Sequence, residues 1–218
     1  MLRHSGNTKL HLHYDPMYEG LTVMYDKGPF IREYLGVLKQ TINLALDQYS
    51  RVLAFRVDLS FPVILDLKEY LDTNRVLSRF LESFKAKVEH NRSQAARRTP
   101  NAFDSKVRYV WAREFGEGGR PHYHLLFLLN LDAFYTVGHL GSENANMISR
   151  LQEAWAGALG LPLGKAAPQV HITENGTYRL RQGDLSGLDE LFRRASYLCK
   201  SSTKLYGDRC HGFGSSRG

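Results

Sequence analysis

The sequence predicts an α+β fold, in which a ferredoxin-like antiparallel sheet of about four to five strands carries helices mainly on one face. One observation is the order of the expected elements. A first helix is followed by strand, helix, strand, strand, helix and strand, and these six form a split β-α-β unit. The other is the glycine-rich stretch GEGGRP at 116–121, which favours a tight hairpin between the two central strands. The face without helices would be free to hold a site.

The first half of the chain supplies a helix, a strand and a second helix. Residues 28–50 place apolar side chains at helical spacing. Residues 51–61 are β-branched and aromatic and alternate in polarity until Pro62, which predicts the first strand. Residues 72–98 again repeat apolar positions with a helical period, and Asp72 is expected to cap this helix.

The second half supplies the hairpin and three further elements. In chain order we expect two strands, a helix, a strand and a last helix, at 106–115, 122–130, 143–159, 168–173 and 184 to about 204. Asp184 is expected to lie at the start of the last helix. Residues 1–29 and 131–142 give no pattern that predicts an element.

The length of 218 residues favours one globular unit with an addition over two full domains. We expect residues 1–50 to be an N-terminal extension and helix, packed on a core formed by 51–218. No apolar run approaches the roughly 18 residues of a membrane span, and the N-terminus lacks the apolar core of a secretory signal. Two cysteines make no disulfide framework. These features predict a reduced, cytoplasmic protein without a membrane partner.

The net charge of 29 − 22 = +7 is concentrated near the C-terminus. Residues 193–218 carry six basic side chains and one acidic side chain. A localised basic surface suggests a polyanion partner, most often nucleic acid, and a solvated tail is the other interpretation. The cations expected to contact DNA are Arg193, Arg194, Lys204 and Arg209.

Two histidines at the start of the second hairpin strand form a candidate metal site. His122 and His124 share one face of that strand because side chains alternate along it. If Glu114 pairs with His122 across the glycine-rich turn, its carboxylate lies beside both imidazoles. Two imidazoles and a carboxylate suit a divalent ion, although a solvated sheet face explains the pair equally well. His11 and His13 have the same spacing, but nothing near them in the sequence supplies a third ligand.

The last expected helix carries a tyrosine on its outer face. An apolar stripe along this helix should face the core, and Tyr197 lies almost opposite its centre. Lys200 and Lys204 lie near Tyr197 on the same outer face. A tyrosine hydroxyl that attacks a phosphodiester needs such nearby positive charge, whereas a simple exposed tyrosine covered by lysine stems needs no function.

These residues resemble the HUH endonucleases, a superfamily of rolling-circle replication initiators, relaxases and transposases. His122, Tyr123 and His124 match the His–hydrophobic–His motif, and Tyr197 to Lys200 match the Y-x-x-K motif. Residues 53–62, LAFRVDLSFP, resemble the first-strand motif loosely. From about residue 30 onward the chain is similar to the inovirus (filamentous phage) replication-initiation protein family, including its prophage-encoded members.

The resemblance implies a metal-dependent, strand-specific DNA nicking and joining enzyme that initiates rolling-circle replication of a phage or prophage. It implies Mg²⁺ or Mn²⁺ on His122, His124 and Glu114, and attack by Tyr197 on single-stranded or origin double-stranded DNA. The products would be a 5′-phosphotyrosine and a free 3′-OH, and Lys200 would assist at the phosphate or the phenol. The implied partners are DNA and a host helicase, in the cytoplasm of a bacterial host. Some family members use two tyrosines, but here the next one, Tyr206, lies beyond the expected helix.

The sequence raises three other interpretations. A histidine-triad nucleotide hydrolase needs a third alternating histidine, and position 126 is leucine. A nonenzymatic nucleic-acid-binding protein that has lost nicking fits the basic C-terminal segment as well as an enzyme does. A zinc site made by Cys199, Cys210 and His211 is disfavoured because Cys199 lies in the apolar stripe.

Overall fold

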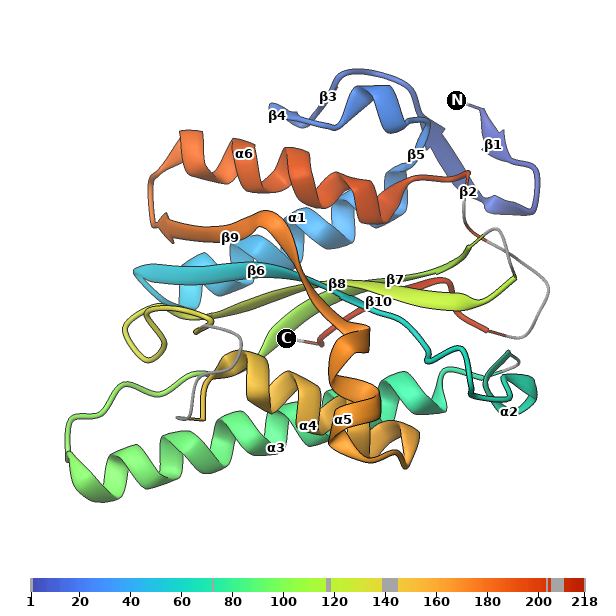
Figure 1. The fold of residues 1–218 in the computed structure, drawn as a ribbon. Helices are drawn as coiled ribbons and strands as arrows, with labels where there is room; N and C mark the ends of the chain where they lie inside the picture. The colour runs from blue at the N-terminus through green and yellow to red at the C-terminus, as the bar shows by residue number, and fades with distance from the viewer. Residues whose placement is uncertain are drawn as a thin grey trace.

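A five-stranded antiparallel sheet lies at the centre of the protein in a computed structural model, which describes residues 2–71, 73–116, 119–138, 145–202, 204 and 210–217 (Figure 1). The strands lie in the order β10, β7, β8, β6, β9. Their bounds are β6 (Arg51–Leu59), β7 (Arg108–Phe115), β8 (Pro121–Asn130), β9 (Val170–Arg181) and β10 (Phe213–Ser215). This confirms the predicted α+β class, the antiparallel sheet and its number of strands.

The four strands β6 to β9 have the connectivity predicted for a β-α-β-β-α-β unit. Side by side in the sheet they lie in the order β7, β8, β6, β9, and every neighbouring pair is antiparallel. The two long crossover helices, α3 (Arg75–Arg98) and α4 (Met147–Leu159), lie on one face of the sheet (Figure 1). Short helices flank them: α2 (Lys68–Leu71), α5 (Leu163–Ala166) and η2 (Ala167–Gln169).

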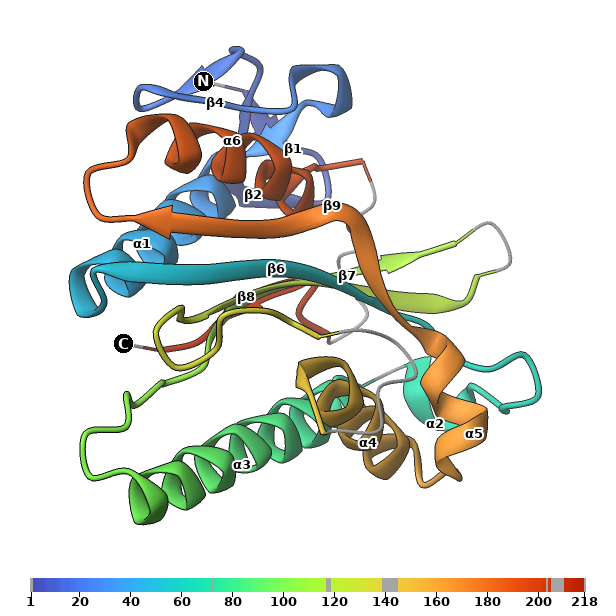
Figure 2. The same ribbon diagram turned by 60° about the vertical axis from the view of Figure 1, so that its left-hand side comes forward.

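The prediction that helices lie mainly on one face is wrong. Helices α1 (Arg32–Gln48) and α6 (Leu185–Ala195) cover the opposite face (Figure 2). The cause is that β6 and β8 are apolar on both sides. Phe55 and Phe127 pack toward α3 and α4, whereas Ala54 and Leu126 pack toward α1 and α6. A strand that is apolar on both faces must be buried on both faces.

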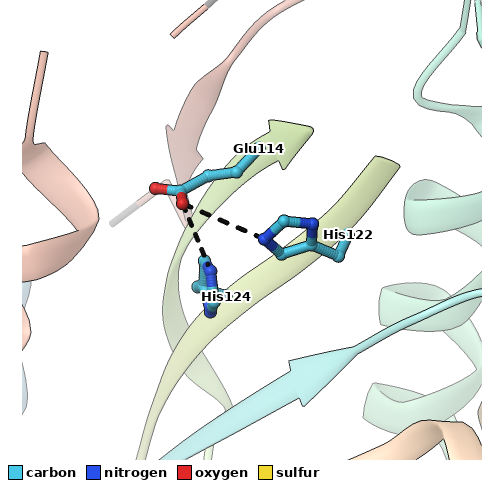
Figure 3. Close-up of side chains that lie close together, drawn as sticks. All are labelled: Glu114, His122 and His124. Atoms are coloured by element: carbon cyan, nitrogen blue, oxygen red, sulfur yellow. Dashed lines mark ion pairs between the residues drawn. The ribbon is translucent and has the colours of Figure 1, made fainter. Parts of the chain in front are cut away.

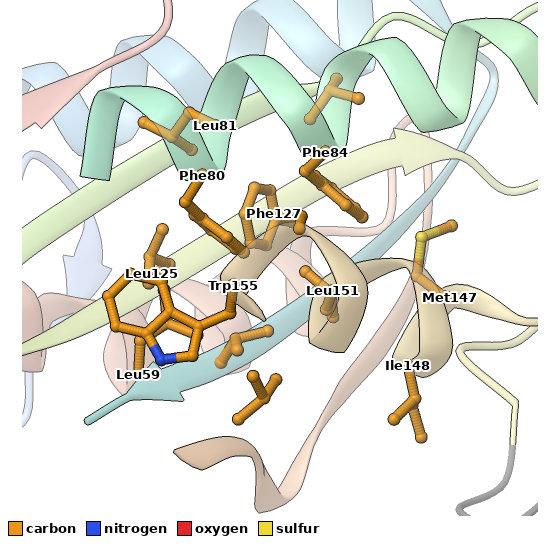
Figure 4. Close-up of a cluster of buried hydrophobic side chains, with 14 of the residues drawn as sticks. Leu59, Phe80, Leu81, Phe84, Leu125, Phe127, Met147, Ile148, Leu151 and Trp155 are labelled. Carbon is orange, nitrogen blue, oxygen red and sulfur yellow. The ribbon is translucent and has the colours of Figure 1, made fainter. Parts of the chain in front are cut away.

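The larger core cluster lies between the sheet and helices α3 and α4 (Figure 4). Most of its aromatic pairs meet edge to face or tilted, for example Phe84 and Phe127 at 4.8 Å and Phe80 and Trp155 at 5.7 Å between ring centroids. The indole N–H of Trp155 donates to the Ser60 carbonyl, so this buried polar group is satisfied. Because Leu125 and Phe127 of β8 belong to this cluster, it holds the β7–β8 hairpin in place.

The N-terminal residues, for which no element was predicted, form small sheets above α6 (Figure 1). These are the three-stranded β1 (Arg3–His4), β2 (Asn7–His13) and β5 (Phe30–Ile31), and the pair β3 (Met17–Tyr18) and β4 (Leu21–Thr22), followed by η1 (Tyr25–Lys27). The backbone N–H and the hydroxyl of Thr22 both donate to Asp189 on α6, at 2.7 and 2.8 Å. This segment therefore packs on the helix that leads to Tyr197.

The last helix is shorter than predicted. Asp184 caps it as expected, because its side chain accepts the backbone N–H of Gly187 at 2.9 Å. The α-helix ends at Ala195 and tightens into the 3-10 helix η3 (Ser196–Cys199). Lys200 then becomes extended and pairs with Phe30 in an isolated β-bridge, which draws the chain out of the helix.

Two other boundaries differ from expectation. The fourth strand runs to Arg181 instead of ending at 173, and it contains a bulge. Helix α3 begins after Asn74, and the predicted cap Asp72 lies outside the described residues. Among the helices that the structure describes, none combines the length and the apolar character that crossing a membrane requires.

Candidate active site

Glu114, His122 and His124 come together at one end of the sheet (Figure 3). Glu114 pairs directly with His122 in the β7–β8 ladder, which confirms the predicted register. Glycine at 119 adopts a positive φ of 68°, and the Gly116 N–H bonds to the Arg120 carbonyl at 3.0 Å, so the turn fixes this pairing. Glu114 Oε2 lies 3.4 Å from His124 Nε2 and 3.9 Å from His122 Nε2.

The three side chains fit a divalent metal ion. Their ligand atoms all lie within 4.8 Å of one another, and they are the only such group of three or more within the described part of the chain. His124 Nε2 is buried and lies at ion-pair distance from Glu114 Oε2, so a metal ion bound by both atoms would replace that contact. Two imidazoles and a carboxylate would leave open positions on a divalent ion for water or substrate.

Asp58 on β6 orients His124 and was not identified from the sequence. It lies directly opposite His124 in the β6–β8 ladder, and its Oδ1 is 2.6 Å from His124 Nδ1. This contact directs Nε2 toward Glu114, as outer-shell carboxylates do for metal-binding histidines. The only signal in the sequence was an acid inside an otherwise apolar strand end, VDLSF.

Replacing Asp58 by asparagine is expected to weaken Mn²⁺ binding by roughly 10- to 100-fold, because His124 loses its orienting carboxylate. Calorimetric titration of the purified protein with Mn²⁺ measures this. Asp47→Asn, at an exposed position of α1, is the matched control and should bind Mn²⁺ like the parent protein. Equal affinities for the Asp58 variant and the parent would contradict the role given to Asp58.

The two imidazoles differ in their electrostatic surroundings. Burial lowers the pKa of His122, and the neighbouring His124 lowers it further. Burial also acts to lower the pKa of His124, but Asp58 and Glu114 outweigh it, and the net pKa is raised. The neutral form is thus favoured at His122, whereas the two carboxylates favour the protonated form of His124 as long as no metal is bound there.

Two lysines hold the carboxylate of Glu114. Lys200 Nζ lies 3.0 Å from Oε2, and Lys204 Nζ lies 3.2 Å from Oε1. Lys204 was predicted to lie on an outer surface facing DNA, but its side chain has no exposed area. That placement is wrong because the chain leaves the helix before Lys204 and turns it toward Glu114. A carboxylate has enough lone pairs to accept both lysines and to bind a metal.

Of the other predicted cations, the structure describes Arg193 and Arg194, which lie near the end of α6. Arg193 is exposed on α6, and Arg194 is half-buried, with Nη2 donating to the Glu174 carbonyl at 3.1 Å. Arg209 and Tyr206 lie outside the described residues.

Tyr197 lies on the face that the histidines share. Its ring meets the His124 ring edge to face at 5.4 Å between centroids, and its hydroxyl accepts from Lys200 Nζ at 2.5 Å. Lys200 thus contacts both the tyrosine and the acidic metal ligand. The Ser196 hydroxyl accepts the Met24 N–H at 2.9 Å, so the N-terminal segment holds the turn that presents Tyr197.

Neither alternative metal site forms within the described residues. His11 Nδ1 is 2.7 Å from Glu33 Oε1, a structural pair at the start of α1, and His13 is buried against the Tyr18 ring. Cys199 is fully buried in the core between α1, α6 and the sheet, and burial raises the pKa of its thiol. These placements agree with the structural interpretations of His13 and Cys199.

Comparison with known proteins identifies relatives along nearly the whole chain. The YagK/YfjJ C-terminal domain family model matches residues 14–216. Uncharacterized protein YfjJ of Escherichia coli strain K12 is 30% identical over 202 residues, covering 88% of this chain and 97% of the relative. Uncharacterized protein YagK of the same strain is 30% identical over 198 residues, covering 87% and 95%. No solved structure matches the chain. The names of these relatives assign no chemistry, so any activity must be argued from the site.

Proposed function

The chain belongs to the YagK/YfjJ C-terminal domain family, and we propose that it is a metal-dependent DNA nicking and joining endonuclease of the HUH type. Its role would be to initiate rolling-circle replication of a phage or prophage in the bacterial cytoplasm. The observation that carries the proposal is the contact of Tyr197 with both His124 and Lys200, beside the Glu114–His122–His124 group. The similarity of these motifs to inovirus replication-initiation proteins supports the same conclusion.

In the proposed reaction, the phenolic oxygen of Tyr197 attacks a phosphodiester of single-stranded DNA. A bond forms between this oxygen and phosphorus, and the bond from phosphorus to the 3′-oxygen breaks. The phenolic proton passes to water, and the leaving 3′-oxygen takes up a proton, which gives a 5′-phosphotyrosine and a free 3′-OH. The Lys200 ammonium, 2.5 Å from the phenolic oxygen, stabilises negative charge there as attack begins.

His122, His124 and Glu114 would hold Mg²⁺ or Mn²⁺, which when bound polarises the scissile phosphate and neutralises charge on it. The chain prepares this site through contacts of its own. Asp58 sets the orientation of His124, and Lys204 holds the second oxygen of Glu114. Arg193 and Arg194 near the end of α6 would add positive charge for binding the DNA strand. A host helicase would open the duplex ahead of the 3′ end.

A nicking assay tests this function. Supercoiled plasmid carrying the replication origin of the protein's own genetic element is incubated with the protein, with Mn²⁺ or with EDTA. We expect open circular product and covalently attached protein only when Mn²⁺ is present. Salt-sensitive, noncovalent complexes without nicking, on both the plasmid and single-stranded origin oligonucleotides, would instead support the nonenzymatic nucleic-acid-binding alternative.

A further inference from the structure

Arg56 is a buried cation next to the tyrosine. It lies on β6 two residues before Asp58, so both side chains point to the sheet face that carries His124. Only 7% of the residue is exposed. Its guanidinium carbon lies 5.3 Å from the centroid of the Tyr197 ring, and Lys200 Nζ lies 3.7 Å from the same centroid. Two cations therefore border the tyrosine ring.

The guanidinium of Arg56 is poorly satisfied by the protein. Its Nη2 is 3.9 Å from Asp58 Oδ1, beyond hydrogen-bond distance, and that oxygen is already 2.6 Å from His124 Nδ1. Its Nη1 makes one long bond of 3.5 Å to the Arg194 carbonyl. Its Nε is buried and has no hydrogen-bond partner. The guanidinium thus presents N–H donors in one plane, and the protein supplies no pair of acceptor oxygens that matches them.

The backbone beside Arg56 departs from the regular sheet. Val57 pairs with Ile172 and Phe55 pairs with Thr177, so residues 173–176 bulge out opposite Arg56. The Glu174 carbonyl in this bulge is held by Arg194. Bulges next to active sites re-aim side chains and end strand pairing, and this one interrupts the edge strand at Arg56.

A buried cation with weak pairing costs stability. Burial lowers the pKa of Arg56, and the nearby Asp58 opposes this only in part. An anionic ligand that pairs with the guanidinium would offset this cost. A phosphate suits this role, because two of its oxygens can accept two N–H groups of one guanidinium.

We propose that Arg56 is a phosphate-binding residue for the substrate strand, contacting a phosphodiester oxygen beside Tyr197 through its unused N–H donors. This inference rests on the proposed function for its substrate, single-stranded DNA. It adds a recognition contact that neither the metal ligands nor the basic surface of α6 supplies.

Binding measurements without metal test the contact separately from catalysis. All proteins carry Tyr197→Phe, and fluorescence anisotropy in EDTA follows the binding of a labelled single-stranded origin oligonucleotide. Its phosphates are replaced one at a time by uncharged methylphosphonates. The variants compared are Arg56→Met and Arg56→Lys. The matched control is Arg108→Met, another buried arginine, which lies at the far end of β7 and bonds to Gln48 at 2.9 Å.

We expect Arg56→Met to weaken binding roughly 10- to 100-fold, as loss of a charge-assisted hydrogen bond does, and to lower the salt slope of binding by about 0.7. A methylphosphonate at one position should lower the affinity of the Arg56 protein for the oligonucleotide but leave the affinity of the Arg56→Met protein unchanged. Arg56→Lys should keep the salt slope and recover only part of the affinity, and Arg108→Met should bind normally. The thermal midpoint of Arg56→Met should equal or exceed that of the parent.

The inference is overturned if both Arg56 variants keep the parent's affinity and salt slope, or if each methylphosphonate affects parent and Arg56→Met equally. If Arg56→Met fails to fold, the test is made with the Arg56→Lys protein. The methylphosphonate that weakens DNA binding by the Arg56 protein must then have a smaller effect, or none, on DNA binding by the Arg56→Lys protein. Nicking by the protein with its native tyrosine, measured separately, decides the proposed function. The two ideas can therefore fail independently.

Discussion

Phenylalanine in place of Tyr197 is expected to abolish nicking, with a loss of at least about 10³-fold in the rate of strand cleavage. The substitution removes only the oxygen that would attack phosphorus. The ring that contacts His124 and lies beside Arg56 is retained, so the fold and the binding of DNA should be unchanged. Cleavage of a labelled single-stranded origin oligonucleotide in Mn²⁺, followed by gel electrophoresis, measures the effect.

A second tyrosine provides the control for this experiment. Tyr14 is 50% exposed and follows β2 in the N-terminal segment, so Tyr14→Phe should cleave at the parent rate. Lys200→Met retains the nucleophile but loses the ammonium beside it, so the rate of strand cleavage should fall by about 10²-fold, less than in Tyr197→Phe. Cleavage by Tyr197→Phe at the parent rate would rule out this tyrosine as the nucleophile.

Combined replacement of His122 and His124 by alanine is expected to remove metal-dependent cleavage, with a loss of at least about 10²-fold in rate. Two of the three ligands are then missing, and Glu114 keeps only its lysine partners. Manganese binding, measured by calorimetry, should disappear along with cleavage. Noncovalent binding of the oligonucleotide in EDTA should persist, because the basic side chains are untouched.

His11→Ala is the matched control for the histidine pair, because His11 has the same sequence spacing to a second histidine but pairs with Glu33. It should bind Mn²⁺ and cleave DNA at the parent level. Full Mn²⁺ affinity in the His122 and His124 double variant would show that the ion binds elsewhere and would remove the basis for the metal site.

The hairpin at the site was predictable because its determinants are local. The glycines after Phe115 specify a tight turn, and a tight turn fixes which residue faces His122. Alternation along the strand then places His122 and His124 on one face. The position of Tyr197 was predictable only in part. Helical periodicity separates it from the apolar stripe, but the predicted outer face is wrong, because the α-helix ends at Ala195 and the half-buried ring of Tyr197 lies against His124.

The parts that were missed depend on contacts between distant segments. Asp58 and Arg56 are ordinary charged residues until β6 is known to lie beside β8 and η3. The helices on the second face of the sheet were not predicted, because residues 125–129 were interpreted as a strand in a sheet with helices mainly on one face. An unbroken apolar run of this kind indicates burial on both faces. The inward turn of Lys204 depends on the bridge between Phe30 and Lys200, which joins residues far apart in sequence.

In the proposed reaction, Tyr197 becomes covalently linked to DNA at the site formed by Glu114, His122 and His124. This link can be detected by trapping the protein on a single-stranded origin oligonucleotide in Mn²⁺, digesting both components and mapping the adduct by mass spectrometry. We expect a nucleotide 5′-phosphate on the peptide containing Tyr197, and no adduct in EDTA. An adduct on another residue, or no adduct in Mn²⁺ while the oligonucleotide remains bound, would contradict it.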